Sequence, residues 1–264
     1  MLAVAVAMGA CVFNAVATVS DVSYTIGGTS DLEQFNINFT LSGKTTTYNN
    51  VYAGGIQISQ PSGSKDGLPN KYVSICTDFL GSLYAGKTYS YLGSPVTPSG
   101  NSGGTDPGWN NASLAFANAS YLFNTYGDLG GGGVGTGNKT GLSVEDMAAL
   151  QLAVWMVLYD TGSTGKVTVN SSSEFYISTA GNSGKDTSAI SLALGWVASL
   201  TGNNKNIDAL LQPDPKVTYS WQSNPAQELM YSSVPEPTTI LAGILLLLPL
   251  GASTIRKLRK SQVK

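Results

Sequence analysis

Two side chains in this sequence, a cysteine and a glutamine, have the chemistry to form a covalent bond with each other. Cys76 stands in the run Ile75-Cys-Thr-Asp78, and Gln151 is the one amide side chain in the apolar run from Met147 to Tyr159. A thiol and a carboxamide condense with loss of ammonia to a thioester when a fold holds sulfur and amide carbon at reacting distance. More often, a buried cysteine is a small apolar core residue and a buried glutamine is a hydrogen-bonding one. A largely apolar setting would also shield the thioester from hydrolysis.

The glutamine lies on a predicted helix with clear ends. Ser143-Val-Glu-Asp146 has the pattern of an N-cap followed by an acidic N3 residue, and we predict a helix from there to about Asp160, ended by Thr161-Gly162. A helix that is apolar all round is a buried helix. An amide taken out of water without partners costs about 1–3 kcal/mol. Gln151 therefore either has hydrogen-bond partners in the core or is present for its chemistry.

The cysteine lies in a part of the chain with strand patterns. Alternating and β-branched residues between Gly, Ser and Pro turns predict strands at Val22 to Ile26, Phe35 to Leu41, Thr46 to Ser59 and Tyr72 to Phe79. Further along, the spacing of apolar residues predicts helices at Ala112 to Tyr126 and Thr187 to Leu200 and a closing strand at Lys216 to Trp221. We therefore expect an α+β fold with an antiparallel, barrel-like sheet body and about three packed helices.

Composition excludes several classes of function. The chain has no histidine, which removes the commonest general base and the commonest zinc ligand, and we expect no metal and no cofactor. Of the 14 basic residues, five lie in the last nine positions, so residues 18–233 carry nine basic against 15 acidic side chains, a net charge of about −6. Such a body disfavours nucleic acid as a partner. A hydrolase with paired carboxylates is a further alternative, but the sequence singles out no such pair.

The N-terminal segment has the character of a signal peptide. Residues 2–13 form an uncharged apolar run, and Ala15-Val-Ala17 supplies a cleavage site with small residues. We predict a signal peptide over residues 1–17, truncated at its start because the usual basic residues are missing; a core helix is the alternative. Its removal takes away Cys11 and leaves Cys76 as the one cysteine of the mature chain.

The C-terminal segment, residues 234–264, has three parts in a fixed order. Pro235-Glu236-Pro237 precedes an uncharged stretch over residues 238–255, which is just long enough to span a bilayer, and a cluster of basic residues follows. This order resembles the PEP-CTERM sorting signal of Gram-negative bacteria. The resemblance implies a transient anchor in the inner membrane, cleavage by an exosortase-type protease, and export to the cell surface or an exopolysaccharide matrix. A plain tail anchor is the alternative.

The cysteine and glutamine motifs also resemble those of a known family. Cys76-Thr-Asp78 and Gln151-Leu-Ala-Val-Trp155 match, in order and residue type, the two motifs of the thioester domains of bacterial surface proteins. The predicted helix at Ala112 to Tyr126 is similar to the one that such domains carry between their motifs. The resemblance covers about residues 45–165 of a secreted domain that we place at residues 18–233.

The family resemblance implies a mechanism and a function. Cys76 attacks the Gln151 amide autocatalytically, and an external amine or hydroxyl later opens the thioester and becomes joined to Gln151, so the protein reacts once and is not a turnover enzyme. Asp78 is expected to hydrogen-bond near the thioester, and Trp155 and Tyr159, at i+4 and i+8 on the helix, to line the pocket. The expected function is covalent adhesion to a nucleophile-bearing target or assembly of an exopolysaccharide matrix. The alternative is a non-covalent carbohydrate-binding or structural matrix protein in which Cys76 stays a thiol.

Overall fold

A computed structural model gives the arrangement of the strands and helices. It describes residues 22–26, 32–41, 43–59, 71–77, 83–92, 111–127, 142–183, 185, 187–201, 209–213, 220 and 229–231. The predicted signal peptide (1–17), the sorting segment (234–264) with Pro235, Glu236, Pro237 and the span 238–255, and Asp78 lie outside these residues. Within the described ranges, no helix combines the length and the apolar character needed to cross a membrane.

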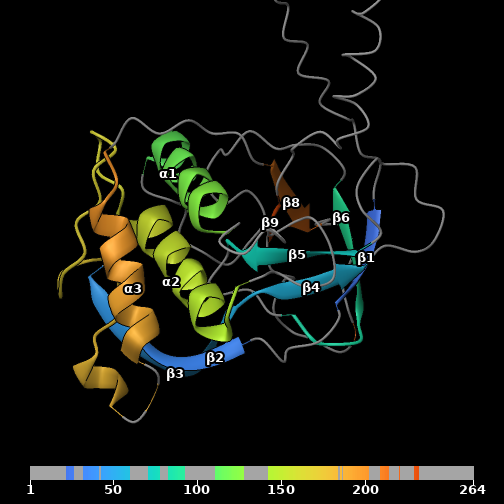
Figure 1. Cartoon of the computed structure of the whole chain (residues 1–264), viewed down its shortest axis with the longest axis horizontal. Helices are drawn as coiled ribbons and strands as arrows, with labels where there is room; N and C mark the ends of the chain where they lie inside the picture. Colours follow the sequence, from blue (N-terminus) through green and yellow to red (C-terminus); the bar gives the residue numbers. More distant parts are fainter. Residues whose placement is uncertain are drawn as a thin grey trace, which may run out of the picture. The chain divides into compact units, whose positions relative to one another are not determined.

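The strands form two antiparallel sheets (Figure 1). The first sheet contains β1 (Val22–Ile26), β4 (Ile56–Ser59), β5 (Lys71–Cys76), β6 (Thr88–Leu92), β8 (Ala209–Pro213) and β9 (Leu229–Tyr231). Its pairings run β1–β4–β5–β9–β8–β6 and return to β1. The second sheet has the order β3–β2–β7 and consists of β3 (Lys44–Gly54), β2 (Leu32–Leu41) and β7 (Phe175–Tyr176). Strand β5, which ends at Cys76, is therefore paired on both sides, with β4 and with β9.

Three α-helices are described: α1 (Ala112–Tyr126), α2 (Val144–Asp160) and α3 (Thr187–Ala198), with a short 3-10 turn, η1 (Ala180–Asn182). Helix α2 is central, since it contacts both other helices and all three strands of the second sheet (Figure 1). Every residue of α2 from Met147 to Tyr159 is buried. The helix that is apolar all round is thus the core of the fold, as the sequence predicted.

Side chains of the second sheet pack onto α2 from one face. Phe35, Ile37 and Phe39 alternate along β2 toward the core and are fully or almost fully buried. Tyr159 on α2 meets Phe39 edge to face at a centroid distance of 5.1 Å and stacks on Phe175 of β7 at 6.2 Å. The strand alternation that the sequence showed is therefore the alternation between a helix-covered face and an outer face.

The predicted α+β class, the antiparallel strands and the three helices are confirmed. The prediction of one strand from Thr46 to Ser59 was wrong, because the chain bends at Gly54, with φ of 146°, and passes from the second sheet into the first at Gly55. Strands β6 to β9 were not individually predicted, and two of them, β7 and β9, have only two and three residues. The predicted strand at Lys216 to Trp221 lies outside the described residues except for Ser220, which is in a turn.

Candidate functional site

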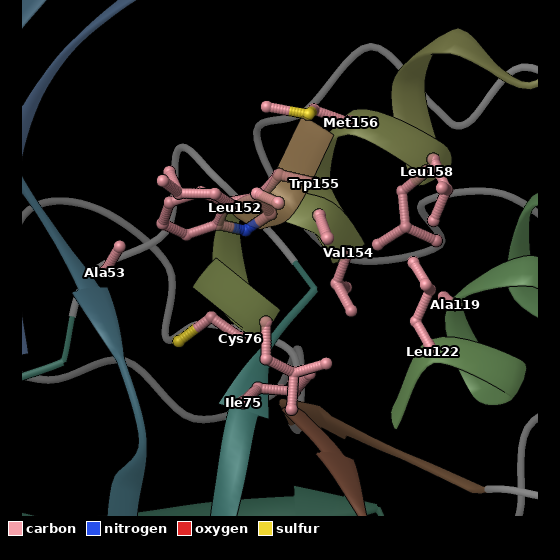
Figure 2. Packing of buried hydrophobic residues seen from close by; sticks show 14 of the residues in the cluster. Ala53, Ile75, Cys76, Ala119, Leu122, Leu152, Val154, Trp155, Met156 and Leu158 are labelled. Carbon is pink, nitrogen blue, oxygen red and sulfur yellow. The ribbon is translucent and has the colours of Figure 1, made fainter. Parts of the chain in front are cut away.

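The structure brings Cys76 and Gln151 together in the core. Cys76 is the last residue of β5, and Gln151 lies in the first half of α2. Their exposed fractions are 3% and 1%. Figure 2 shows Cys76 and Ile75 at the end of β5, close to the part of α2 that carries Leu152 and Trp155.

Two hydrogen bonds join the Gln151 carboxamide to the backbone of Cys76. The Cys76 N–H donates to Gln151 Oε1 at 2.9 Å, and Gln151 Nε2 donates to the Cys76 carbonyl oxygen at 2.6 Å. In an antiparallel sheet, a residue in the same way donates its N–H to, and accepts at its C=O from, a single residue of the neighbouring strand. The side-chain amide of Gln151 therefore takes the place of the C=O and N–H of a partner-strand residue at the end of β5. These bonds satisfy the buried amide, which answers why a glutamine is tolerated in α2.

The sulfur of Cys76 belongs to the residue whose backbone N–H and C=O bind the Gln151 amide. Cys76 is buried and is not part of a disulfide among the described residues. Next to it, Ser74 Oγ donates to the Met230 carbonyl oxygen at 2.6 Å and ties β5 to β9, and Thr77 is fully buried. The end of β5 is thus a buried polar cluster inside an apolar core, which the sequence motif alone did not reveal.

Two of the other predicted site residues, Trp155 and Tyr159, are described, and their place in a thioester pocket stays a prediction. Trp155 and Tyr159 are buried on α2, and the rings of both approach Phe175 of β7, with centroid distances of 5.8 Å and 6.2 Å. They hold α2 against the second sheet. Asp78 lies outside the described residues.

A titratable group that sequence reasoning treated only as the end of a helix lies at the C-terminus of α2. The Asp160 carboxylate accepts hydrogen bonds from the backbone N–H groups of Glu174, at 2.8 Å, and Phe175, at 3.2 Å. Burial raises the pKa of Asp160 from 3.8 to about 7, with a further contribution from the nearby Glu174 charge, although the two N–H donors act in the opposite direction. The carboxylate fastens the end of α2 to β7.

The N-terminus of α2 is fixed by the capping box that the sequence predicted. Ser143 Oγ accepts from the Asp146 N–H at 3.0 Å, and the Asp146 side chain accepts from the Ser143 N–H at 3.3 Å. Helix α2 is therefore held at both ends, and Gln151 lies between the two fixed points.

Comparison with protein-family models, with curated proteins and with solved structures gave no match to this chain. The part of the chain that the structure describes also contains no cluster of three or more Cys, Asp or Glu side chains arranged to hold a metal ion. The chemistry of Cys76 and Gln151 and the surfaces around them are therefore the features that bear on function.

Proposed function

We propose that this protein acts at the cell surface or in an extracellular matrix, in covalent adhesion or exopolysaccharide-matrix assembly, through an internal thioester between Cys76 and Gln151. We further propose that its closed order of strand pairings and its three helices form a thioester-domain fold. The observation that carries the proposal is the pair of hydrogen bonds between the Gln151 carboxamide and the Cys76 backbone. They hold the two reacting residues against each other across a separation of 75 positions in the chain.

The same hydrogen bonds suit the bond-forming step. Attack of Cys76 Sγ on the Gln151 amide carbon forms a C–S bond and places negative charge on Oε1, where the Cys76 N–H already donates. The C–N bond then breaks, and Nε2 leaves as ammonia with the proton of the thiol. Burial of both residues keeps water away from the product, since each is at most 3% exposed.

The second step joins the protein to its target. An external amine or hydroxyl attacks the thioester carbonyl, its proton passes to the departing sulfur, and an amide or ester to Gln151 remains. Cys76 becomes a thiol again, but Gln151 is consumed, so each molecule reacts once. The C-terminal segment, with Pro235, Glu236 and Pro237, is proposed to be the signal by which an exosortase-type protease exports the protein.

The test is the intact mass of the protein purified without reductant or amines, beside the Cys76→Ala variant. We expect the wild-type mass to be lower than its sequence mass by one ammonia, the variant to have its full mass, and added methylamine to form an adduct only with the wild type. A wild-type protein of full mass whose thiol titrates under native conditions would refute the covalent mechanism.

A second candidate function, non-covalent carbohydrate binding, is favoured by the outer face of the second sheet. Along β2 this face carries amide and hydroxyl side chains that alternate with the buried aromatic and aliphatic ones: Gln34, Asn36, Asn38 and Thr40. Across the strand pairs, Thr47 Oγ1 donates to Asn38 Oδ1 at 2.7 Å, and Tyr52, opposite Gln34, is 58% exposed. Amide and hydroxyl groups beside an exposed ring match the hydroxyl groups and apolar faces of sugars.

This candidate is tested by sedimentation with insoluble neutral polysaccharide. Tyr52→Ala should reduce binding, whereas Tyr121→Ala, a matched change of an exposed tyrosine on α1, should not. Equal binding by both variants and the wild type would exclude this face.

A further inference from the structure

Gly55 lies at the point where the Gln151 helix and the Cys76 strand approach the same backbone segment. It joins β3 to β4 and is buried. A Cβ atom at Gly55 would lie 2.5 Å from Met147 Cε and 2.8 Å from Val73 Cγ1, closer than atoms of this kind pack. The backbone of Gly55 is thus in direct contact with one side chain of α2 and one of β5.

Both side chains that Gly55 contacts lie on the two elements that carry Gln151 and Cys76. Met147 precedes Gln151 by about one helical turn, on the same face of α2. Val73 lies three residues before Cys76 on β5. In the pairing of β4 with β5, Ile56 is opposite Ser74, so Gly55 stands one step further toward the Cys76 end of the strand.

Space rather than backbone conformation requires glycine at this position. Gly54 has a φ of 146°, in the region that favours glycine, but Gly55 is not among the glycines with positive φ. Any L-residue could adopt its backbone conformation, and it is the volume of a side chain that has no room.

We infer that Gly55 is a positioning residue for the Cys76–Gln151 pair, because its missing side chain lets α2 approach β5 closely enough for both Gln151 hydrogen bonds to form. For thioester formation this inference rests on the proposed function. For the hydrogen bonds it does not.

The expected response is graded by the size of the side chain. Met147 Cε is the end of a flexible chain and can turn aside, whereas Val73 is β-branched and stiff, so an added methyl group forces β5 and α2 apart. Displacements of about 1 Å cost reactions of positioned groups on the order of 100-fold. Thioester formation should therefore be slower by roughly 10- to 100-fold in Gly55→Ala and slower still in Gly55→Val.

The experiment compares Gly55→Ala with a control and with a relieved variant in the full chain. Gly195→Ala is the control, because a Cβ at that exposed position of α3 meets nothing within 4 Å. The relieved variant combines Gly55→Ala with Val73→Ala and Met147→Leu, which remove the two atoms that the new Cβ would meet. The variant with those two changes alone serves as its reference.

Two measurements separate the inference from the proposed function. Intact mass follows the loss of ammonia, and hydrogen exchange of the Cys76 amide follows its bond to Gln151 Oε1, with the amide of Asn38 in the second sheet as an internal reference. We expect Gly55→Ala to slow ammonia loss and to lower protection at Cys76 but not at Asn38. Gly195→Ala should behave as wild type, and the relieved variant should recover both signals.

Each outcome has a definite meaning. If the wild type loses no ammonia but Cys76 protection falls in Gly55→Ala and returns in the relieved variant, the proposed function fails and the positioning role stands. Unchanged protection and unchanged ammonia loss in Gly55→Ala would overturn the positioning role. If Gly55→Ala does not fold, the relieved variant is compared with its reference. If the reference folds and forms the Cys76–Gln151 hydrogen bond but the relieved variant does not, the positioning role is overturned.

Discussion

The substitution Gln151→Glu, made together with Cys76→Ala, tests how the core holds the glutamine. Alanine at position 76 keeps the backbone N–H and C=O that bind the side chain and removes the sulfur, so no covalent bond contributes to stability. The substitution at Gln151 keeps the shape of the side chain and an oxygen for the N–H donor. In the glutamine, Nε2 donates to the carbonyl oxygen of residue 76 at a distance of 2.6 Å. The substitution replaces this nitrogen with an oxygen.

The introduced carboxyl fits this site only when it is protonated, because only its O–H can donate to that carbonyl. Position 151 is 1% exposed, and both the lost hydration and the facing carbonyl raise the folded-state pKa above the value of about 4.3 in the unfolded chain. Between these two pKa values the folded state binds more protons, so the free energy of unfolding falls as the pH rises. At about 1.4 kcal/mol per pH unit, the loss reaches up to about 5 kcal/mol between about pH 4.3 and pH 8.

The assay is urea unfolding of Cys76→Ala with and without Gln151→Glu across this pH range. Their difference in the free energy of unfolding cancels the titration of every other group. We expect a small difference near the unfolded pKa and one of several kcal/mol at neutral pH, whereas Gln151→Leu should cost about the same at every pH because it leaves the N–H and C=O of residue 76 unsatisfied. A difference that does not change with pH in the Gln151→Glu variant would refute the paired geometry.

Three further changes test the elements that hold α2. The pKa of Asp160 is raised from 3.8 to about 7, so between these two pH values the folded state binds more protons at Asp160 than the unfolded state, and the free energy of unfolding falls as the pH rises. Asp160→Asn removes this group and should flatten the dependence in urea unfolding measured at acid and at neutral pH. Ser143→Ala removes the capping box and should lower stability by about 1 kcal/mol, seen as a lower urea midpoint with an unchanged m-value. Asn118 on α1 donates to the Gly165 carbonyl at 2.9 Å and to Thr161 Oγ1 at 3.2 Å, so Asn118→Ala should cost roughly 1–3 kcal/mol by the same measurement.

Local signals in the sequence were sufficient to predict helix α2. A serine at the N-cap and an aspartate at N3 both make the predicted bonds, and the uninterrupted apolar run from Met147 to Tyr159 is buried throughout. These features depend on residues within one turn of each other or on a single helix, so tertiary contacts did not change them.

The environment of the cysteine depends on residues far away in the chain, which is why it could not be predicted to the same degree. Strand β5 is completed by β9, where Ile75 pairs with Met230, and β9 has only three residues. Strand β7, whose Phe175 N–H donates to the Asp160 carboxylate, has only two residues. Such short strands have too few residues to show an alternating pattern, and only the pairing itself identifies them.

The hydrogen bonds of Gln151 explain the glutamine but not the cysteine. Both bonds go to backbone atoms of residue 76, so a valine or alanine at that position would satisfy the amide equally well. A purely structural role for the pair therefore predicts that Cys76→Ala changes only local packing. The covalent role predicts a second effect, the loss of a cross-link that restrains the unfolded chain between positions 76 and 151, which a backbone-bonded glutamine cannot replace. The identity of residue 76 thus separates the two roles, whereas the position of Gln151 is common to both.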